Sequence, residues 1–170
     1  VFILFIIIYN KYYIIYYTTI IMTPDVWGPP IWTLFHCLAE KIKEEKFAEL
    51  GPQIYSFIVQ ICKMLPCPDC SAHASQFLSK INPATITSKD ILRSILFTFH
   101  TNVNTRKKKP KFDNALLTKY KSLNLIIAFK NFTIAYNSRG NMKQLNESFH
   151  RTRLVKHFTQ WMIANGESFD

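Results

Sequence analysis

The sequence Leu65-Pro66-Cys67-Pro68-Asp69-Cys70-Ser71-Ala72-His73 places two thiols three residues apart. Two thiols at this spacing can close one short disulfide or share one metal ion. Proline is tolerated in the first turn of a helix, so we expect a helix that starts at Pro68 with Cys67 near its N-cap. The N-terminal end of a helix stabilises a thiolate. We therefore expect the chemistry of the protein at this cysteine pair.

The pair has three interpretations: a redox dithiol, half of a zinc site, or two core cysteines. Zinc needs two further ligands, and the chain has neither a second Cys-x-x-Cys nor a histidine pair at finger spacing. His73 would have to join a distant His36 or His100. A thioredoxin-like fold would place the pair after a strand in a βαβ unit, which the helical pattern does not offer.

The composition predicts an all-α fold with one main domain. The chain has 170 residues, 48% of them hydrophobic, with 14 Phe and only 4 Gly. Apolar residues recur mainly at helical spacing, and alternating apolar runs are few. Four cysteines are too few and too unevenly spaced for the disulfide framework of a small secreted domain. We expect Cys37 and Cys62 to be buried apolar residues of helices.

The net charge of +10 lies almost entirely in the second part of the chain. Residues 1–100 carry eight Lys/Arg against seven Asp/Glu, whereas residues 101–170 carry thirteen against four. This asymmetry indicates a phosphate-bearing ligand, an acidic partner or a nucleic-acid surface. The alternative is a solvated basic face that keeps the protein soluble.

Residues 1–21, VFILFIIIYNKYYIIYYTTII, are about as long as a membrane span but carry Asn10 and Lys11 at their centre. A central lysine disfavours insertion into a bilayer. No basic segment precedes the apolar run and no small-residue cleavage site follows it, as a signal peptide would require. Met22 resembles an ordinary start, so we expect residues 1–21 to be upstream translated sequence, with a membrane anchor as the alternative.

Helices are predicted over most of the remaining chain. Pro29-Pro30 is expected to open the first, Gly51-Pro52 to separate it from the second, and Pro66 to end the second. Ser88 is a plausible cap for the helix that ends at the basic run 106–110. One further helix is expected over 115–136, then a turn at 137–141 and an amphipathic helix over 144–165.

Several polar and aromatic residues of these helices suit a flavin as the electron acceptor of the dithiol. Trp32 offers a flat face for stacking, and the histidines and asparagines offer hydrogen bonds to ring edges or ribose. Lys109 and its neighbours can neutralise a pyrophosphate. Each feature alone has a simpler explanation, since Trp and His at helical spacing usually belong to the core and a lysine run is usually a solvated face. Their joint occurrence favours the flavin.

Together these motifs resemble the Erv/ALR family of FAD-linked sulfhydryl oxidases. The resemblance runs through Gly28-Pro29-Pro30-Ile31-Trp32-Thr33-Leu34-Phe35-His36, then Cys67-Pro68-Asp69-Cys70 with His73, then His100-Thr101-Asn102-Val103-Asn104 and Lys109-Pro110. The sequence departs from the family pattern at Thr101, where the family has Asn, and in having no cysteine after Cys70. The short forms of poxviruses and other large DNA viruses are similar in the latter respect.

The resemblance implies a four-helix bundle with a short fifth helix, to which this chain adds a C-terminal helical extension. Residues 22–120 would form the FAD-binding sulfhydryl oxidase domain, and residues 121–170 a basic helical extension whose role the sequence does not reveal. Cys70 would lie against the flavin, and Cys67 would be attacked by the incoming thiol. The residues expected to contact FAD are Gly28, Trp32, His36, Asp69, His73, His100, Asn102, Val103, Asn104, Lys109 and Tyr120.

The family's activity implies a thiol-containing protein as substrate and O2 as the final acceptor, giving hydrogen peroxide. Because the chain has no cysteine pair in a tail, we expect any dithiol shuttle to be a separate protein. A homodimer and a location in the host cytoplasm or the virion are further expectations from the resemblance. The alternative function is a basic helical module that binds nucleic acid or a partner and carries a structural Cys/His zinc site.

Overall fold

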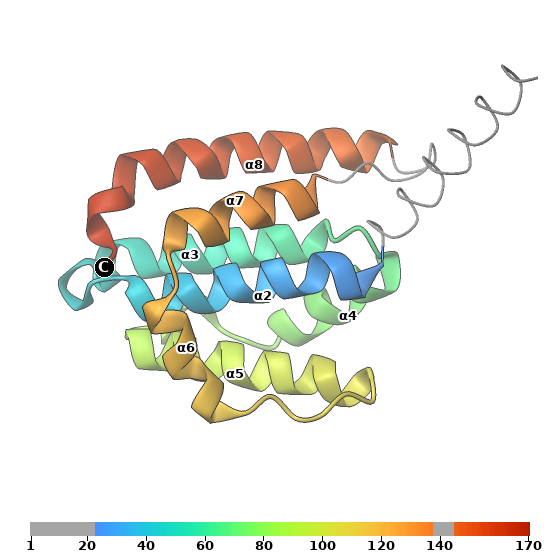
Figure 1. Ribbon diagram of the computed structural model, residues 1–170, viewed down its shortest axis with the longest axis horizontal. Helices are drawn as coiled ribbons and strands as arrows, with labels where there is room; N and C mark the ends of the chain where they lie inside the picture. Colours follow the sequence, from blue (N-terminus) through green and yellow to red (C-terminus); the bar gives the residue numbers. More distant parts are fainter. Residues whose placement is uncertain (1–22, 138–144) are drawn as a thin grey trace, which may run out of the picture.

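The computed structural model describes residues 23–137 and 145–170, and these residues form an all-helical fold (Figure 1). The all-α prediction is therefore confirmed. The described residues contain no β-strand, and only an isolated antiparallel bridge joins Ile42 to Phe169. The α-helices are α2 (Pro24–Lys41), α3 (Glu44–Lys63), α4 (Pro68–Leu78), α5 (Lys89–Arg106), α6 (Leu117–Ser122), α7 (Leu125–Tyr136) and α8 (Leu145–Asn165).

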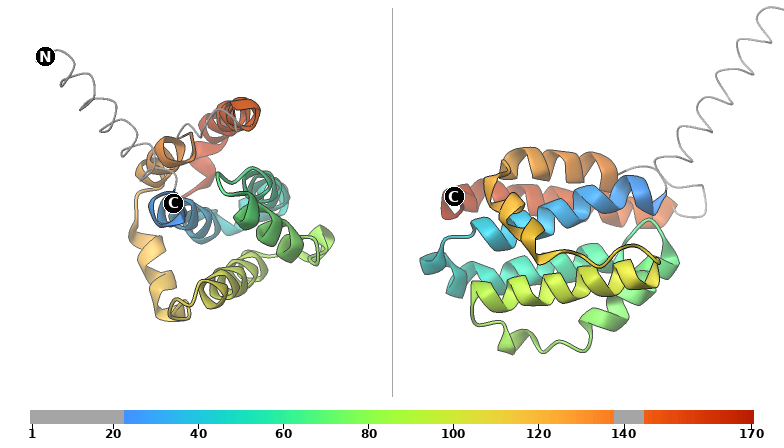
Figure 2. Two further views of the ribbon diagram at one scale, coloured as in Figure 1. Left: turned by 90° about the vertical axis from the view of Figure 1, so that its right-hand side faces the viewer. Right: turned by 60° about the horizontal axis from the view of Figure 1, so that its bottom comes forward.

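Helices α2 to α5 form the bundle, and the short helix α6 crosses one side of it between α5 and α7 (Figures 1 and 2). Their facing sides are apolar, as the helical spacing of hydrophobic residues predicts. Leu34, Ile58 and Leu96 are fully buried at the centre. A partly buried ion pair joins α2 to α5, in which the Arg93 Nε–H donates to Glu40 Oε1 at 2.6 Å.

The first helix begins at Pro24, so the expectation that Pro29-Pro30 opens it is wrong. Pro24 occupies the first turn instead, and both later prolines lie inside the helix. Proline removes the hydrogen bond to the carbonyl four residues earlier. Here those carbonyls belong to Asp25 and Val26, which are exposed. Water can therefore satisfy them, and the helix continues.

Gly51-Pro52 does not separate two helices, as predicted, but lies inside α3. A Cβ at Gly51 would lie 2.7 Å from the ring of Phe47, which is buried. Glycine at this position makes room for that ring against the helix backbone. The carbonyl that Pro52 leaves without a partner belongs to the exposed Ala48. Gly51 therefore allows close packing of the Phe47 ring and does not end the helix.

The single helix expected over 115–136 is divided into α6 and α7. Leu123 adopts an extended backbone conformation, and Asn124 caps α7 by accepting a hydrogen bond from the Ile127 N–H at 3.0 Å. Asparagine is a strong N-cap because its side chain satisfies a free N–H of the first turn. The break allows α7 to turn and run along α2 (Figure 1).

Helices α7 and α8 pack on the bundle on the side away from α5 (Figure 2). Tyr136 of α7 is buried and its hydroxyl donates to the Ile61 carbonyl of α3 at 3.1 Å. Phe158 of α8 is fully buried and stacks on Phe57 of α3, with ring centroids 4.3 Å apart. The extension beyond residue 120 is thus tightly packed against the preceding helices.

Backbone hydrogen bonds join the C-terminal residues after α8 to the connection between α2 and α3. A short 3-10 turn, Gly166–Ser168, follows α8. The Lys43 N–H donates to the Ser168 carbonyl at 3.0 Å, and the Asp170 N–H donates to the Lys41 carbonyl at 2.8 Å. These bonds explain the isolated bridge between Ile42 and Phe169.

Residues 1–21 lie outside the described part of the chain, as does most of the turn expected at 137–141. Within residues 23–137 and 145–170, no helix is both long and apolar enough to cross a membrane.

Candidate functional site

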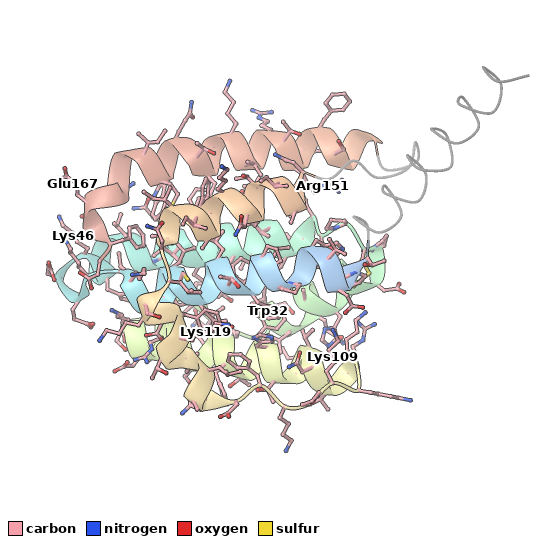
Figure 3. All side chains as sticks on the ribbon, viewed as in Figure 1. Trp32, Lys46, Lys109, Lys119, Arg151 and Glu167 are labelled. Atoms are coloured by element: carbon pink, nitrogen blue, oxygen red, sulfur yellow. A yellow bond between two sulfur atoms is a disulfide. The ribbon has the colours of Figure 1, made fainter. Side chains whose placement is uncertain are left out.

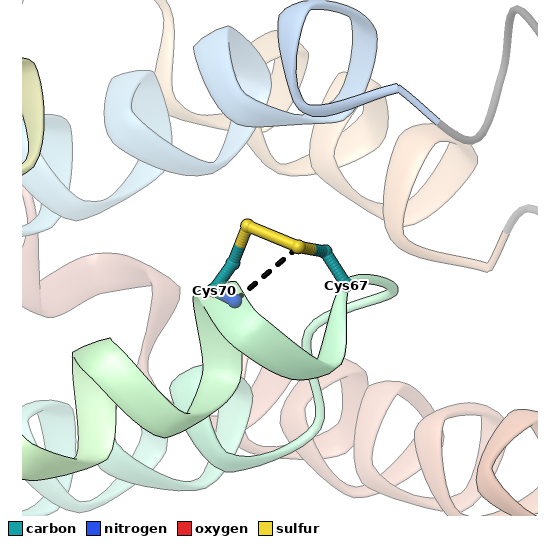
Figure 4. Close-up of a disulfide and its surroundings, with 2 residues drawn as sticks. All are labelled: Cys67 and Cys70. Atoms are coloured by element: carbon teal, nitrogen blue, oxygen red, sulfur yellow. Dashed lines mark hydrogen bonds between the residues drawn. A yellow bond between two sulfur atoms is a disulfide. The ribbon is translucent and has the colours of Figure 1, made fainter. Parts of the chain in front are cut away.

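Cys67 and Cys70 form a disulfide at the N-terminal end of α4 (Figure 4). As predicted, Cys67 is the N-cap and Pro68 the first helical residue. The Cys70 N–H donates to Cys67 Sγ at 3.2 Å, so the Cys67 sulfur already accepts a free N–H of the first turn. Ser71 Oγ donates to the Lys63 carbonyl at 2.6 Å and fastens this turn to the end of α3. The cysteine pair is therefore held by backbone hydrogen bonds at a site that favours a sulfur anion.

Cys70 lines a cavity of about 400 Å³ between α2, α4, α5 and α6. We call it the Cys70 cavity. Cys67 is not among its lining residues, although both cysteines are partly exposed. Eight of the residues predicted to contact a cofactor line this cavity: Gly28, Trp32, His73, His100, Val103, Asn104, Lys109 and Tyr120.

Stacked rings form one wall of the Cys70 cavity. Trp32 and His100 stack almost in parallel, with centroids 4.0 Å apart and planes inclined by 4°. Phe112 stacks on His100 at 4.1 Å. The label of Trp32 in Figure 3 shows this ring between α2 and α5. The wall combines large flat surfaces with few hydrogen-bonding groups, which suits a planar aromatic ligand.

His36 lies beside this wall and is almost completely buried. Its Nε2 and His100 Nδ1 are 3.0 Å apart, so one ring donates a hydrogen bond to the other. Burial, with a smaller effect of the neighbouring His100, lowers the pKa of His36 to about 3. Burial likewise lowers the pKa of His100 to about 4. Both rings are therefore neutral at physiological pH.

Cationic side chains surround the mouth of the cavity. Lys109 Nζ lies 2.5 Å from Asp25 Oδ1, and this contact lowers the pKa of the Asp25 carboxyl. Figure 3 labels Lys109 in the loop that follows α5, close to the end of that helix. Arg106, Lys107 and Lys119 also line the cavity. Lys119 was not predicted, because the helical register beyond Phe112 is weak in the sequence, although it directly precedes the predicted Tyr120.

Three of the predicted residues do not line the cavity. His36 supports the ring wall from behind, and Asp69 is an exposed residue of the first turn of α4. Asn102 is also exposed, and its side chain forms a hydrogen bond with His73. Burial lowers the pKa of His73, and this hydrogen bond partly opposes the effect. Asn102 therefore lies beside His73 outside the cavity lining.

Thr101 is the position at which the sequence departs from the Erv/ALR pattern. Its hydroxyl oxygen is buried and has no hydrogen-bond partner within the described residues. A buried hydroxyl without a partner is unfavourable. The side chain does not reach the Cys70 cavity.

The two other cysteines are buried and unpaired with each other. Burial raises the pKa of Cys37 to about 11 and also raises that of Cys62. Cys62 lines the Cys70 cavity, whereas the Cys37 thiol lies 3.6 Å from the Tyr120 carbonyl and donates to it. Neither thiol is readily ionised, so neither is suited to thiol–disulfide exchange.

The zinc interpretation would require the cysteine pair to meet further ligands. Across residues 23–137 and 145–170, no group of three or more His, Cys, Asp and Glu side chains is close enough to hold a metal ion. The histidines named as possible ligands instead lie in the ring wall and at the cavity.

The fold and the site together define a helical bundle that holds a cysteine pair beside a cavity lined by aromatic and cationic side chains. The chain belongs to the Erv1/Alr family, whose model matches residues 29–122. Helices α7 and α8 lie beyond the matched range. No solved structure matches the chain at a significant level.

Two viral relatives illustrate the similarity. A protein of Invertebrate iridescent virus 6 named "Putative FAD-linked sulfhydryl oxidase" is 26% identical over 102 residues, covering 56% of this chain and 92% of the relative. The FAD-linked sulfhydryl oxidase of African swine fever virus (isolate Warthog/Namibia/Wart80/1980) is 31% identical over 83 residues. That match covers 49% of this chain and 69% of the relative.

Proposed function

We propose that this protein is a FAD-linked sulfhydryl oxidase that forms disulfides in protein substrates. Its family and the names of its viral relatives support the activity. The observation that carries the proposal is the position of the Cys67–Cys70 disulfide, with Cys70 in the wall of an aromatic cavity and Cys67 outside it.

The residues of the Cys70 cavity fit FAD by their chemistry. Trp32 and His100 supply flat faces for a ring system, and Asn104 supplies a polar side chain. Lys109 and the other cations at the mouth match the charge of a pyrophosphate. Gly28 has no atom within 4 Å of its hypothetical Cβ, so the wall beside it is open to a ligand. We therefore propose the predicted contact residues that line the cavity as the FAD site.

The proposed reaction begins with thiol–disulfide exchange. A substrate thiolate attacks Cys67 Sγ, the Cys67–Cys70 bond breaks, and Cys70 leaves as a thiolate. A second substrate thiol then attacks the mixed disulfide, which closes the substrate disulfide and releases Cys67. The substrate has lost two electrons and two protons, and the cysteine pair is reduced. The Cys70 N–H, which donates to Cys67 Sγ in the disulfide, is placed to stabilise Cys67 as a thiolate, and the N-terminal end of α4 favours the thiolate of Cys70.

Bound FAD would take the electron pair from the reduced cysteines and pass it to O2, giving hydrogen peroxide. The protein contributes the position of Cys70 in the cavity wall and the neutral ring of His100 in the ring wall, with the neutral ring of His36 behind it. Because both pKa values are lowered, the two histidines are uncharged. A ring system can therefore pack against the wall without the free-energy cost of burying a charge.

The proposal extends to partners and location. The immediate thiol donor is a substrate protein or a separate dithiol shuttle protein, and residues 71–170 contain no cysteine that could take this role. From the resemblance to the Erv/ALR family we further propose that the protein is a homodimer and acts in the host cytoplasm or the virion. Light scattering of the purified protein tests the dimer, and a monomer at micromolar concentration would contradict it.

The activity is tested on the purified protein with a small dithiol. We expect a flavin absorbance band and production of one hydrogen peroxide for each pair of thiols oxidised. Cys37→Ala, which removes a buried cysteine outside the cavity, should retain both properties. A colourless protein that contains zinc would contradict the proposal.

A further inference from the structure

A basic groove runs between α3 and α8, on a different part of the surface from the Cys70 cavity. We call it the α8 groove. Six of its lining residues belong to α8, and four of these have basic side chains and are exposed: His150, Arg153, Lys156 and His157. Gln60 and Met64 of α3 form the opposite wall. Stacking of Phe57 on Phe158 holds the two helices together beneath the groove.

The lining of the α8 groove contains no acidic side chain. The ion pairs found within the described residues join Arg93 to Glu40 and Asp90, and Lys109 to Asp25. Arg153 and Lys156 are in none of them. Arg153 and Lys156, two cations with no acidic partner among the described residues, create a local positive potential that attracts an acidic partner.

One end of the groove lies close to the redox disulfide. Met64 is the C-cap residue of α3, and Cys67, three residues later, is the N-cap residue of α4. Consecutive Cα atoms are about 3.8 Å apart, so the Cα atoms of Met64 and Cys67 are separated by at most about 11 Å. The bond from Ser71 Oγ to the Lys63 carbonyl fixes this junction. A chain seated in the groove would therefore have its neighbouring residues within reach of Cys67.

We propose that the α8 groove binds an acidic segment of the thiol-donating protein and thereby presents the donor's thiols to Cys67. This inference rests on the proposed oxidase function and specifies its substrate class. Arg153 and Lys156 provide the positive charge, and Met64 marks the end at which the substrate cysteine approaches. These are docking residues, since none of them lines the Cys70 cavity.

The position of the groove favours a protein over a nucleic acid as its occupant. Nucleic acid offers no thiol, so binding it here would block the approach to Cys67 without serving exchange. An acidic peptide segment uses the same charges and places a cysteine at the disulfide. Electrostatic complementarity of this kind acts chiefly on the rate of encounter and on partner choice.

The test compares three dithiols as substrates of the holoprotein. They are dithiothreitol, a Cys-x-x-Cys peptide with an acidic tail, and the same peptide with each Asp and Glu replaced by Asn and Gln. The double variant Arg153→Glu/Lys156→Glu is compared with Lys121→Glu/Lys130→Glu, which makes the same charge change at exposed residues outside the groove.

For the wild type we expect kcat/KM for the acidic peptide to exceed that for the neutral peptide by about tenfold at low salt. Arg153→Glu/Lys156→Glu should abolish this preference and leave dithiothreitol oxidation unchanged. Equal kcat/KM values for the two peptides in the wild type would contradict the proposed role of the groove. The same holds if both double variants lose the preference for the acidic peptide equally. The proposal would also be contradicted if the wild type bound an oligonucleotide tightly, lost this binding in Arg153→Glu/Lys156→Glu, and showed no preference for the acidic peptide. Failure of the wild type to oxidise dithiothreitol would refute the oxidase function itself.

Discussion

His36 Nε2 and His100 Nδ1 lie 3.0 Å apart in the buried part of the ring wall, joined by one hydrogen bond between the two rings. Two protonated imidazoles would both be donors, so the pair requires at least one neutral ring. Burial lowers the pKa of His36 to about 3 and that of His100 to about 4, both from 6.5.

This pair makes the folded protein sensitive to acid. Below about pH 6.5 the unfolded chain binds more protons at these residues than the folded chain does, so stability falls as the pH decreases toward 4. We expect the free energy of unfolding in urea to drop by a few kcal/mol between about pH 7 and pH 4.5. His36→Gln should show a shallower decrease, and an identical decrease in the variant would contradict this assignment.

Lys109 is expected to strengthen FAD binding through its charge at the cavity mouth. Lys109→Met removes that charge and should weaken FAD binding to the apoprotein by about tenfold, measured by titration of flavin fluorescence. Lys108→Met is the matched control, because it changes the same charge in the same loop and Lys108 does not line the cavity. Equal effects of the two substitutions would indicate only a general contribution of positive charge.

Arg151 is predicted to reduce the stability of the fold. Its side chain, labelled in Figure 3, belongs to α8. It is 1% exposed, and its Nε, Nη1 and Nη2 have no hydrogen-bond partner among the described residues. Replacing an unpaired buried charge by an apolar side chain removes a desolvation cost. Arg151→Met should therefore raise the free energy of unfolding by about 1–4 kcal/mol. Arg153→Met, at an exposed position, should change it little, and a loss of stability in Arg151→Met would contradict the prediction.

Helix α7 is expected to contribute to the stability of the whole bundle. Phe132 is fully buried, so Phe132→Ala should lower the free energy of unfolding by about 3–5 kcal/mol. Ile134→Ala on the same helix, at a position 65% exposed, should change it by less than about 0.5 kcal/mol. If both variants unfolded in urea like the wild type, α7 would contribute nothing to the stability of the bundle.

Local signals predicted the parts of the fold that depend on neighbouring residues alone. Pro68 after Cys67 and Ser88 before α5 gave correct helix starts, since each cap is formed by residues a few positions apart. Gly51 and Pro29 were misread because their effect depends on context. A ring packed on Gly51 and exposed carbonyls before Pro29 allow both helices to continue.

The candidate site was predictable to the extent that its residues belong to recognisable motifs. Trp32, Cys70 and His100 come from such motifs and lie at one cavity. Lys119 reaches the cavity only because the chain after α5 folds back over it. The α8 groove depends on the packing of α8 against α3, more than eighty residues apart in the sequence. Spacing within one helix does not reveal either relationship.

The central claim is that the Cys67–Cys70 pair passes electrons from substrate thiols to bound FAD. Its most direct test is the flavin absorbance of the purified protein after anaerobic addition of a dithiol. We predict that the absorbance of the wild type is lost rapidly, whereas Cys70→Ser retains FAD and keeps its absorbance. Loss of the absorbance in Cys70→Ser at the rate of the wild type would contradict the account.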